Sequence, residues 1–583
     1  MAPIANLCES FMSHRQPAAA TSQSLFFLLC ALLPWLNPVS GGAMTPGIPL
    51  LLGWLCIVLL FVSFPAFWGS ATAVYAGVFV VTAAVGSIFL NTSWQLLAVG
   101  VAMIGAAAAV GAHCAQLRDG QTGHDAQAGI RLIAWSWLLA GLINAAIGLL
   151  QAKQWAGWLE PLVNYAPPGN IYGNLRQRNQ FATLMTMALW ALWYLWSSYG
   201  LGAGKRWART GWAWALTLPL LLALSLTLSR TGFLQVAALV LMLVWWHGRG
   251  VARAQSQPLW PWLVFVVVVY ALASWKFPHL FAGGTDLFGR LDGSDTRACV
   301  SRTVLWHNVW TLALQKPWTG WGWGELAHAH YAANYSELRF CLMLDNAHNL
   351  PLHMAFSFGL PVALALVLGV LWWVLRQRVW AEMSAVRQLM WGVLAMIAIH
   401  SLVEYPLWYS PFMLALGLAL GVLWTWPRAG AQPLATPVDT RIWHYGQVTV
   451  GMLMLAGVLY ASFDFVRVTQ LYTEPQDRVW PFKERTVEQA QRTLLYQNAV
   501  AFAGVTTIPL TPANAEQQLA QARALMTYSP EARVVQRIIE SLRVLGRDAE
   551  ADREEVHFQE VYPSEYQAWK APKDDTSEEE QLQ

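Results

Sequence analysis

The residues that could do chemistry gather in a polar interruption between hydrophobic segments, residues 276–349. His348 lies near its end, in the run DNAHNLPLH from Asp345 to His353. Unlike the arginines, carboxylates and tyrosine considered with it below, His348 has an ordinary pKa, about 6.5, that suits a base at neutral pH. Asp345 could pair with the imidazole or orient it. We therefore predict that this stretch is the active-site loop and that His348 is the general base.

Four arginines occur in motifs that accompany this loop. Arg176 and Arg178 lie in PPGNIYGNLRQRNQ, Arg230 lies in LSRTG, and Arg302 lies in SRTVLW. Arginines at a membrane without an equal number of acids predict an anionic ligand, because guanidinium groups bind phosphate oxygens in pairs. A lipid diphosphate is the natural candidate. The alternatives are anchoring to lipid headgroups for the first two arginines and structural ion pairing for Arg230.

Two further stretches could take part in the reaction or could be structural. HSLVEYPLWYS contains Glu404 and Tyr405, which could support catalysis or simply end a helix. The run KPWTGWGWGE at 316–325 indicates an interfacial belt or, alternatively, a sugar platform.

Cys299 and Cys341 are the two cysteines that we expect outside the membrane and the cytoplasm, and they share one loop. Disulfides persist in an oxidising compartment. We therefore predict that these two cysteines are bonded to each other.

The composition predicts an all-helical polytopic membrane protein. Of the 583 residues, 56% are hydrophobic, 12% are charged and 34 are Trp, whereas globular proteins carry about 25% charged residues. The apolar runs are continuous, unlike the alternating segments of outer-membrane barrels. Basic residues are scattered over short loops, which argues against nucleic-acid binding. Thirteen spans are expected, near residues 24–39, 48–67, 71–90, 94–114, 131–151, 180–198, 212–228, 231–246, 259–275, 350–375, 388–403, 409–426 and 446–463.

The distribution of Lys and Arg sets the expected orientation. With the N-terminus in the cytoplasm, the short inner loops carry most basic residues, as the positive-inside rule requires. The large loop and the tail then lie outside, which in a bacterium is the periplasm. The expected organisation is a cytoplasmic N-terminus at 1–23, a transmembrane catalytic domain at 24–463 containing the periplasmic loop 276–349, a periplasmic helical domain at 464–570 and a disordered acidic tail at 571–583.

The periplasmic domain contains a predicted helical hairpin. From Ala515 to Gly546, apolar residues recur every three or four positions in two segments separated by Pro530. One hairpin of tetratricopeptide size cannot bury its own apolar face, so we expect residues 488–505 to pack with it.

These motifs resemble those of a known family. YGNLRQRNQFATL is similar to the signature of bacterial protein O-oligosaccharyltransferases of the PglL type, also called pilin glycosylation ligases. SRTG, SRTVLW and DNAHNLPLH resemble the shared core of the O-antigen ligase and polymerase superfamily. The resemblance covers residues 20–470 in topology, and a periplasmic helical tail also fits such enzymes.

The resemblance implies a GT-C-like glycosyltransferase of the inner membrane. Such an enzyme moves a preassembled oligosaccharide from undecaprenyl diphosphate to Ser or Thr of a periplasmic protein such as pilin. The loop histidine of the family matches His348, its diphosphate-binding arginines match Arg230 and Arg302, and the tyrosine of its E-Y-P turn matches Tyr405. Arg176 and Arg178 match the signature arginines, and we assign them to the donor as well.

No cofactor and no metal are expected, because the sequence has no DxD motif and no Cys/His metal spacing.

Three other functions stay open. An O-antigen ligase would use the same donor and a lipid A-core acceptor, although RQRNQ and the tail argue against it. A polymerase would extend the glycan itself. A lipid or polysaccharide transporter would lack catalysis, although no pair of matched broken helices indicates an inverted repeat.

Overall fold

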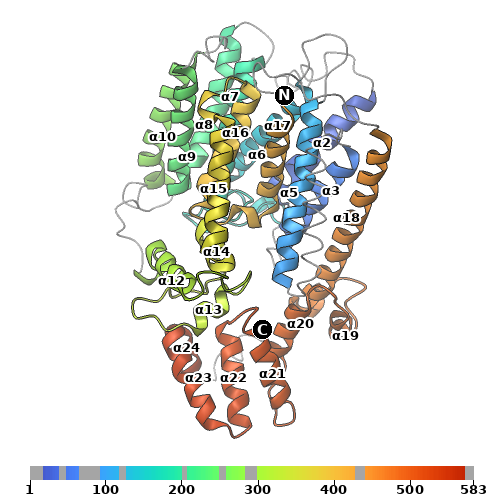
Figure 1. Ribbon diagram of the computed structural model, residues 1–583, viewed down its shortest axis with the longest axis vertical. Coiled ribbons are helices and arrows are strands. Elements are labelled where there is room, and N and C mark those ends of the chain that lie inside the picture. The colour runs from blue at the N-terminus through green and yellow to red at the C-terminus, as the bar shows by residue number, and fades with distance from the viewer. Residues whose placement is uncertain are drawn as a thin grey trace. The chain divides into compact units, whose positions relative to one another are not determined.

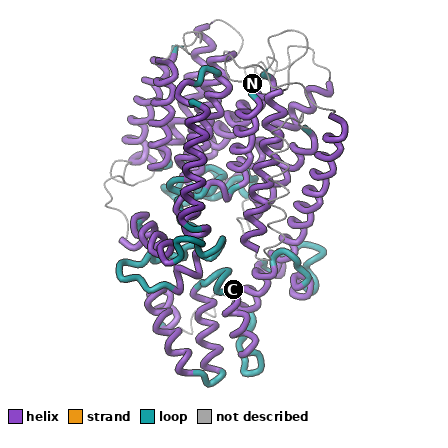
Figure 2. The backbone as a smooth tube through the Cα atoms, in the orientation of Figure 1, coloured by secondary structure: helices purple, strands orange, loops and turns teal. Residues whose placement is uncertain are grey.

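The computed structural model describes residues 18–38, 47–64, 92–116, 127–199, 206–248, 258–281, 298–426 and 440–571. All regular secondary structure in these ranges is helical (Figure 1 and Figure 2). The chain divides into two compact units, each built from two segments. We call Met1–Asp295 with Gly369–Phe463 the membrane unit, and Thr296–Leu368 with Asp464–Gln583 the loop–tail unit.

The membrane unit is a bundle of apolar helices. It contains α2 (Ala18–Leu36), α3 (Gly47–Ser63), α5 (Thr92–Gln116), α6 (Ala128–Ala152), α7 (Arg178–Tyr199), α8 (Arg206–Leu226), α9 (Arg230–Gly248), α10 (Leu259–Phe281), α16 (Ala385–Ser401) and α17 (Ser410–Thr425). Two more helices, α15 (Leu360–Gln377) and α18 (Thr440–Thr469), run across the boundary between the units. Within the described ranges, six helices are long and apolar enough to cross a membrane. The protein is therefore a polytopic membrane protein.

Small residues let helices of this bundle approach closely. A Cβ atom on Gly421 of α17 would lie 1.9 Å from the carbonyl oxygen of Ala108 in α5, and one on Gly111 would lie 2.3 Å from that of Leu418. Larger side chains would separate the two helices. Close backbone contact of this kind replaces the hydrophobic driving force that lipid cannot supply.

Eleven of the thirteen predicted spans each coincide with one described helix, and the range 71–90 lies outside the described residues. The expectation of one span at 350–375 was wrong. Two helices occupy that range, α14 (Leu350–Phe358) and α15, and Gly359 separates them with a φ of +85°. The Leu360 N–H donates to the Pro317 carbonyl (2.7 Å), and a Cβ on residue 359 would lie 2.5 Å from the Trp318 carbonyl oxygen, so glycine is required at the break.

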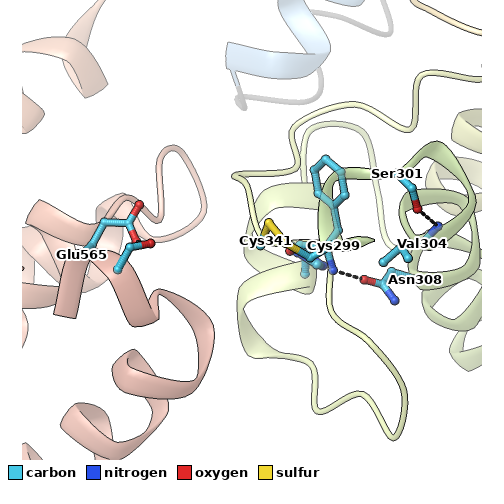
Figure 3. Close-up of a disulfide and its surroundings, with 9 residues drawn as sticks. Cys299, Ser301, Val304, Asn308, Cys341 and Glu565 are labelled. Atoms are coloured by element: carbon cyan, nitrogen blue, oxygen red, sulfur yellow. Dashed lines mark hydrogen bonds between the residues drawn. A yellow bond between two sulfur atoms is a disulfide. The ribbon is translucent and has the colours of Figure 1, made fainter. Parts of the chain in front are cut away.

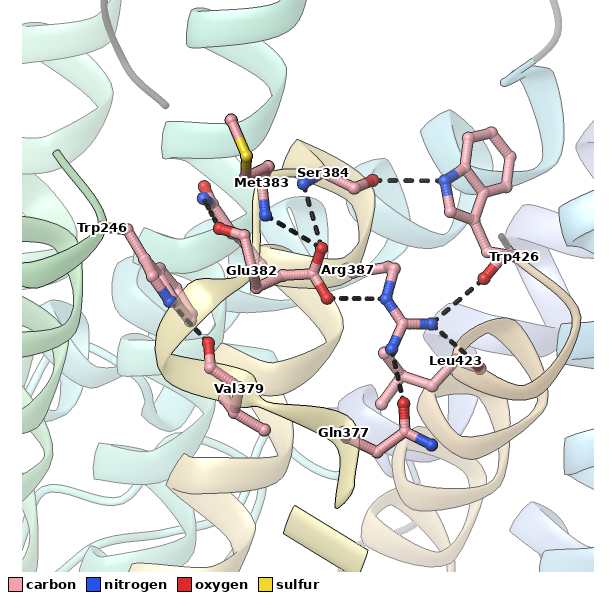
Figure 4. A network of polar contacts seen from close by, with 10 residues as sticks. Trp246, Gln377, Val379, Glu382, Met383, Ser384, Arg387, Leu423 and Trp426 are labelled. Carbon is pink, nitrogen blue, oxygen red and sulfur yellow. Dashed lines mark hydrogen bonds and ion pairs between the residues drawn. The ribbon is translucent and has the colours of Figure 1, made fainter. Parts of the chain in front are cut away.

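A buried ion pair joins three helix ends in the membrane unit (Figure 4). Arg387 of α16 donates from Nε to Glu382 (2.7 Å), and both side chains are at most 3% exposed. Its other nitrogens donate to the carbonyls of Leu423 in the last turn of α17 and Trp426 just after it, and to the Gln377 side chain at the end of α15. Glu382 also accepts two backbone N–H groups. Because its hydrogen-bonding groups are paired in this way, the cluster fixes how α15, α16 and α17 meet.

The loop–tail unit combines the large polar loop with the tail. The loop contributes η3 (Ala298–Val300), α12 (Arg302–Gln315), α13 (Leu326–Ala332) and α14. The tail contributes η6 (Gln470–Tyr472), η7 (Pro475–Asp477), α19 (Thr486–Gln491), α20 (Gln497–Thr507), α21 (Ala515–Leu525), α22 (Ala532–Val544), α23 (Asp548–Val561) and α24 (Pro563–Lys570).

Tyr331 of α13 belongs to the hydrophobic core of the tail. It is 6% exposed and packs with the buried faces of α20 to α23. Its ring stacks on Tyr562 with 6.1 Å between centroids, and its carbonyl accepts a hydrogen bond from His557 Nε2 (2.8 Å). Loop and tail, which we had assigned to separate regions, thus share one core.

The tail contains the hairpin predicted for Ala515 to Gly546, formed by α21 and α22 with Pro530 between them. Gly546 follows α22 with a φ of +71°, as expected of a glycine that ends a helix. α20, which overlaps most of its length with the stretch 488–505 predicted to pack with the hairpin, packs against both of its helices. The predicted disorder of the final acidic stretch falls almost entirely beyond the described ranges.

A disulfide and an asparagine fasten the loop segment before α14 (Figure 3). Cys299 and Cys341 are bonded, with 5.4 Å between their Cα atoms. Asn308 of α12 accepts the Phe340 N–H (2.7 Å) and donates to the Leu338 carbonyl (3.1 Å). The segment that leads to His348 is therefore attached to η3 by the disulfide and to α12 by Asn308.

His330 holds the other side of this segment and is 4% exposed. Its Nε2 lies 3.1 Å from the Phe340 carbonyl, which can only accept, so Nε2 carries the proton. Nδ1 then accepts from the Tyr335 hydroxyl (2.8 Å). Burial, with a contribution from nearby Arg339, lowers the pKa of His330 to about 4.

The buried ion pair generates a stability prediction. Arg387→Ala should destabilise the protein by about 3–5 kcal/mol, because it leaves the Glu382 charge buried without its partner. The double variant Arg387→Met, Glu382→Met should recover most of the loss. Arg492→Ala is the control: it removes an exposed pair with Glu488 and should change stability by about 1 kcal/mol or less. Thermal unfolding in detergent measures all three, and equal losses in Arg387→Ala and the control would contradict the prediction.

His330 generates a pH prediction. Its pKa in the folded protein, about 4, is below the ordinary value of about 6.5, so between these values the unfolded state binds more protons. The stability contributed by neutral His330 is therefore fully present above about pH 6.5 and is lost as the pH falls towards 4. Hydrogen exchange of the α13 amides, corrected for intrinsic rates, should show this loss in the wild type but much less in His330→Gln. Replacing the exposed His307 with glutamine should leave the wild-type profile unchanged; the same profile in His330→Gln would refute the assignment.

Candidate functional site

The predicted site residues fall into two groups, one in each unit. Arg176, Arg178, Arg230, Glu404 and Tyr405 belong to the membrane unit. Arg302, Asp345, His348 and the disulfide-bonded cysteines belong to the loop–tail unit. Each group has its own internal geometry.

Arg176 and Arg178 brace the connection between α6 and α7. Arg176, with a φ of +59°, donates from Nε to the Asn164 side chain (2.9 Å). Arg178, the first residue of α7, donates to the Gly169 carbonyl (3.2 Å) and to the Asn170 side chain. Desolvation lowers the pKa of Arg176. Both arginines thus have a structural role in the described connection, and donor binding by them stays a prediction.

Arg230 and Arg302 occupy equivalent positions at the starts of two helices. Each is the first residue of its helix, α9 or α12, and each follows a serine. Ser229 accepts the Gly232 N–H (3.0 Å), and Ser301 accepts the Val304 N–H (3.3 Å), so both serines are N-caps. A helix N-terminus favours anions through its N–H groups and its dipole. The Ser-Arg-Thr sequence therefore places a guanidinium where an anion is already favoured.

Glu404 and Tyr405 lie in the turn between α16 and α17. Glu404 is 4% exposed, and its carboxylate accepts a hydrogen bond from Asn179 of α7 (3.2 Å). The Tyr405 ring packs against Trp408 and Tyr409 at centroid distances of 6.0 and 5.9 Å. The carboxylate thus contacts another helix in addition to its place at a helix end.

His348 stands out in the loop–tail unit by its backbone. Its φ is +48°, an uncommon conformation for a residue with a side chain. The His348 N–H donates to the Asn346 side chain (2.9 Å), and Asn349 caps α14 by accepting the Leu352 N–H (3.0 Å). The helix cap is therefore Asn349, and His348 lies one residue before it with its side chain partly accessible.

Asp345 and His353 flank this turn. Desolvation raises the pKa of the Asp345 carboxyl, and the charge of His348 opposes that rise, although part of the residue remains at the surface. His353 is 3% exposed; its Nδ1 accepts a long hydrogen bond from the Ala347 N–H (3.4 Å), and its ring packs edge-on against Trp323. The polar residues around His348 thus hold the backbone that presents it.

The Gly-Trp run at 316–325 caps the C-terminal end of α14 with hydrogen bonds from a different part of the chain. Gly320, Gly322 and Gly324 all have positive φ, at 70°, 108° and 88°. This path lets the N–H groups of Trp321 and Gly322 donate to carbonyls in the last turn of α14 (2.8 and 3.0 Å). Such carbonyls would otherwise lack partners. The backbone of this run therefore caps a helix. Its tryptophan side chains remain candidates for an interfacial belt or a sugar platform.

Asn179, Ser229, Asn346 and Asn349 received no role from the sequence. The signal for the serine and Asn349 was available, since Ser and Asn are preferred N-caps. Asn179 gave no such signal, because its two partners are separated from it by 50 and 225 residues.

Three family models match different parts of the chain. A model described as protein glycosylation ligase matches 171–196, which contain the YGNLRQRNQ motif. The O-antigen ligase model matches 215–367, which contain both Ser-Arg-Thr sequences and His348. A model for the C-terminal part of a virulence factor membrane-bound polymerase matches 388–576.

A general O-oligosaccharyltransferase of Acinetobacter baylyi is 26% identical to this chain over 268 residues, which cover 40% of this chain and 44% of that protein. The match therefore spans less than half the length of that relative. Together with the three family models, it confirms the resemblance predicted from the motifs. The chain is thus similar to the O-antigen ligase superfamily and, within it, to protein glycosylation ligases.

Proposed function

We propose that this protein is an O-oligosaccharyltransferase of the bacterial inner membrane. It transfers a preassembled oligosaccharide en bloc from undecaprenyl diphosphate to Ser or Thr of a periplasmic protein such as pilin. The large loop and the tail face the periplasm in this proposal. Similarity to a general O-oligosaccharyltransferase and to protein glycosylation ligases supports the transfer reaction.

The observation that carries the proposal is the construction of the His348 turn. Asn346 accepts the backbone N–H of His348 itself and Asn349 accepts the N–H of Leu352, and neither bond involves the His348 imidazole. A residue held at a φ of +48° by its neighbours stores local strain. Such strain favours a role for the side chain that this backbone presents.

The proposed reaction is a direct displacement with inversion. The acceptor hydroxyl oxygen forms a bond to the anomeric carbon while the bond from that carbon to the diphosphate oxygen breaks. The hydroxyl proton goes to the imidazole of His348, and the electron pair of the broken bond stays on the departing lipid diphosphate. Atoms and charges balance without a further reactant.

Arg230 and Arg302 would stabilise the charge on the departing diphosphate. Each arginine lies at a helix start, so its guanidinium and the nearby backbone N–H groups can bind the same anion. This combination should bind a diphosphate more tightly than a single lysine would. Their effect grows as the leaving group gains charge, so it lowers the barrier rather than only binding the donor.

Polymerisation of the glycan is the second candidate, favoured by the match of 388–576 to a polymerase C-terminal model. Coexpression with a lipid-linked glycan locus and a candidate pilin separates the two. A single glycan mass added to the pilin, measured by intact mass spectrometry, supports transfer to protein. A ladder of glycan lengths on the lipid, with unmodified pilin, would support polymerisation instead.

His348→Ala tests the proposed base. Turnover should fall by about 10²–10⁴-fold, the usual contribution of such a group, while membrane insertion and thermal unfolding stay close to wild type because Asn349 caps α14. His328→Ala, at a half-buried histidine of the same loop, should keep activity. Full pilin glycosylation by His348→Ala in a rate-limited assay would remove the base assignment and make Tyr405 with Glu404 the leading candidates.

Arg230→Lys and Arg302→Lys test the donor site. Each keeps the charge but loses the fork, so kcat/KM for the lipid-linked donor should fall about 10–100-fold, as for loss of a charge-assisted hydrogen bond of about 1.5–3 kcal/mol. Arg492→Lys in the exposed tail is the matched control. Equal kinetics in all three variants would argue against donor contact by either arginine.

A further inference from the structure

Three sequence motifs of the membrane unit meet at the side chain of Asn179. It lies in the RQRNQ motif at the start of α7. It contacts Ser229 of the SRTG motif and Glu404 of the EYP turn, and both of these residues are 4% exposed. None of the roles proposed above for the site residues explains why Asn179 contacts both Ser229 and Glu404.

The contacts form a chain with one direction. Asn179 Nδ2 donates to Glu404 Oε1 (3.2 Å), and Asn179 Oδ1 accepts from the Ser229 hydroxyl (2.7 Å). Ser229 Oγ in turn accepts the Gly232 N–H of α9 (3.0 Å). Because the amide oxygen accepts from Ser229, the amide nitrogen is the group that donates to Glu404. The chain therefore runs from a buried acidic side chain to the helix start that carries Arg230.

A second set of bonds fixes the turn of α7 beneath this chain. The Asn179 carbonyl accepts from the Thr183 hydroxyl (2.8 Å). Thr183 Oγ1 accepts from Gln235 Nε2 (2.9 Å), which also donates to the Met396 carbonyl (2.8 Å). These bonds thus tie α7, α9 and α16 together one turn after Asn179 and fix the backbone that carries its side chain.

We propose that Asn179 is a positioning residue for the donor arginine. By linking Glu404 to the N-cap of α9, it fixes the orientation of the helix start from which Arg230 extends. Polarisation along the chain also strengthens the Ser229–Gly232 bond, because hydrogen bonds in series reinforce one another. The inference rests on the proposed function, in which Arg230 contacts the diphosphate of the donor.

The hydrogen-bonded chain can be tested by exchanging the amide at position 179 with the carboxyl group at position 404. Asn179→Asp places one carboxylate against another and removes the donor group. Glu404→Gln alone retains an acceptor for Asn179 Nδ2. The double variant Asn179→Asp, Glu404→Gln rebuilds the chain with its two groups exchanged. The amide introduced at position 404 can donate to the carboxylate introduced at position 179, and that carboxylate still accepts from Ser229.

The measurement is steady-state transfer from a polyprenyl-diphosphate-linked oligosaccharide to pilin in detergent, with thermal unfolding alongside. Asn179→Asp should raise the donor KM at least about tenfold, which corresponds to about 1.4 kcal/mol. The double variant should bring the donor KM back to within about threefold of the value for Glu404→Gln alone, whatever effect that single change has by itself. If Asn179→Asp does not accumulate as folded protein, Asn179→Ala replaces it and should raise the donor KM without rescue by Glu404→Gln.

A donor KM unchanged in Asn179→Asp, or in Asn179→Ala where that variant replaces it, would overturn the inference. A double variant as impaired as Asn179→Asp would overturn it too. So would a fall in the unfolding temperature that accounts for all lost activity, since that outcome means a purely structural bond. Absence of transfer by the wild-type enzyme would instead refute the proposed function, so the two failures are distinguishable.

Discussion

Backbone polar groups next to a bilayer must find partners inside the protein, because the hydrocarbon offers none. The connection between α6 and α7 shows how this constraint acts. Gln151 of α6 donates to the carbonyls of Asn164 and Gly173 and accepts the Gly173 N–H, while Asn144 donates to the Trp35 carbonyl and accepts the Asn174 N–H. Buried amides that are costly in lipid thus make an irregular connection possible.

The same constraint explains why polar residues cluster in the motifs. Helix starts need acceptors for their N–H groups, which Ser229, Ser301 and Asn349 supply. Helix ends need donors, which the Gly-Trp run supplies to α14. Most polar residues of each motif therefore stabilise helix ends, and only one or two side chains per motif are available for chemistry.

The sequence predicted helices well because span length and apolar composition are local properties. It missed the break at Gly359, since the reason for the break lies in contacts with Pro317 and Trp318, which are distant in the sequence. It also missed the link from Asn179 to Ser229 and Glu404, because nothing in a single sequence marks such distant pairs. The residue types His348, Arg230 and Arg302 were identifiable from their chemistry and motifs, but their backbone settings at a strained turn and two capped helix starts were not.

The shared core around Tyr331 has a consequence for how this kind of chain can diversify. Helix α13 contributes a ring to the interior of the tail, so a tail taken from a relative would meet a loop shaped for another partner. The loop segment and the tail are separated in sequence by the membrane-unit segment Gly369–Phe463, yet they must change together. Recombination within the gene, or the construction of chimeras, should therefore succeed when both segments are exchanged as a pair and should give misassembled protein when either is exchanged alone.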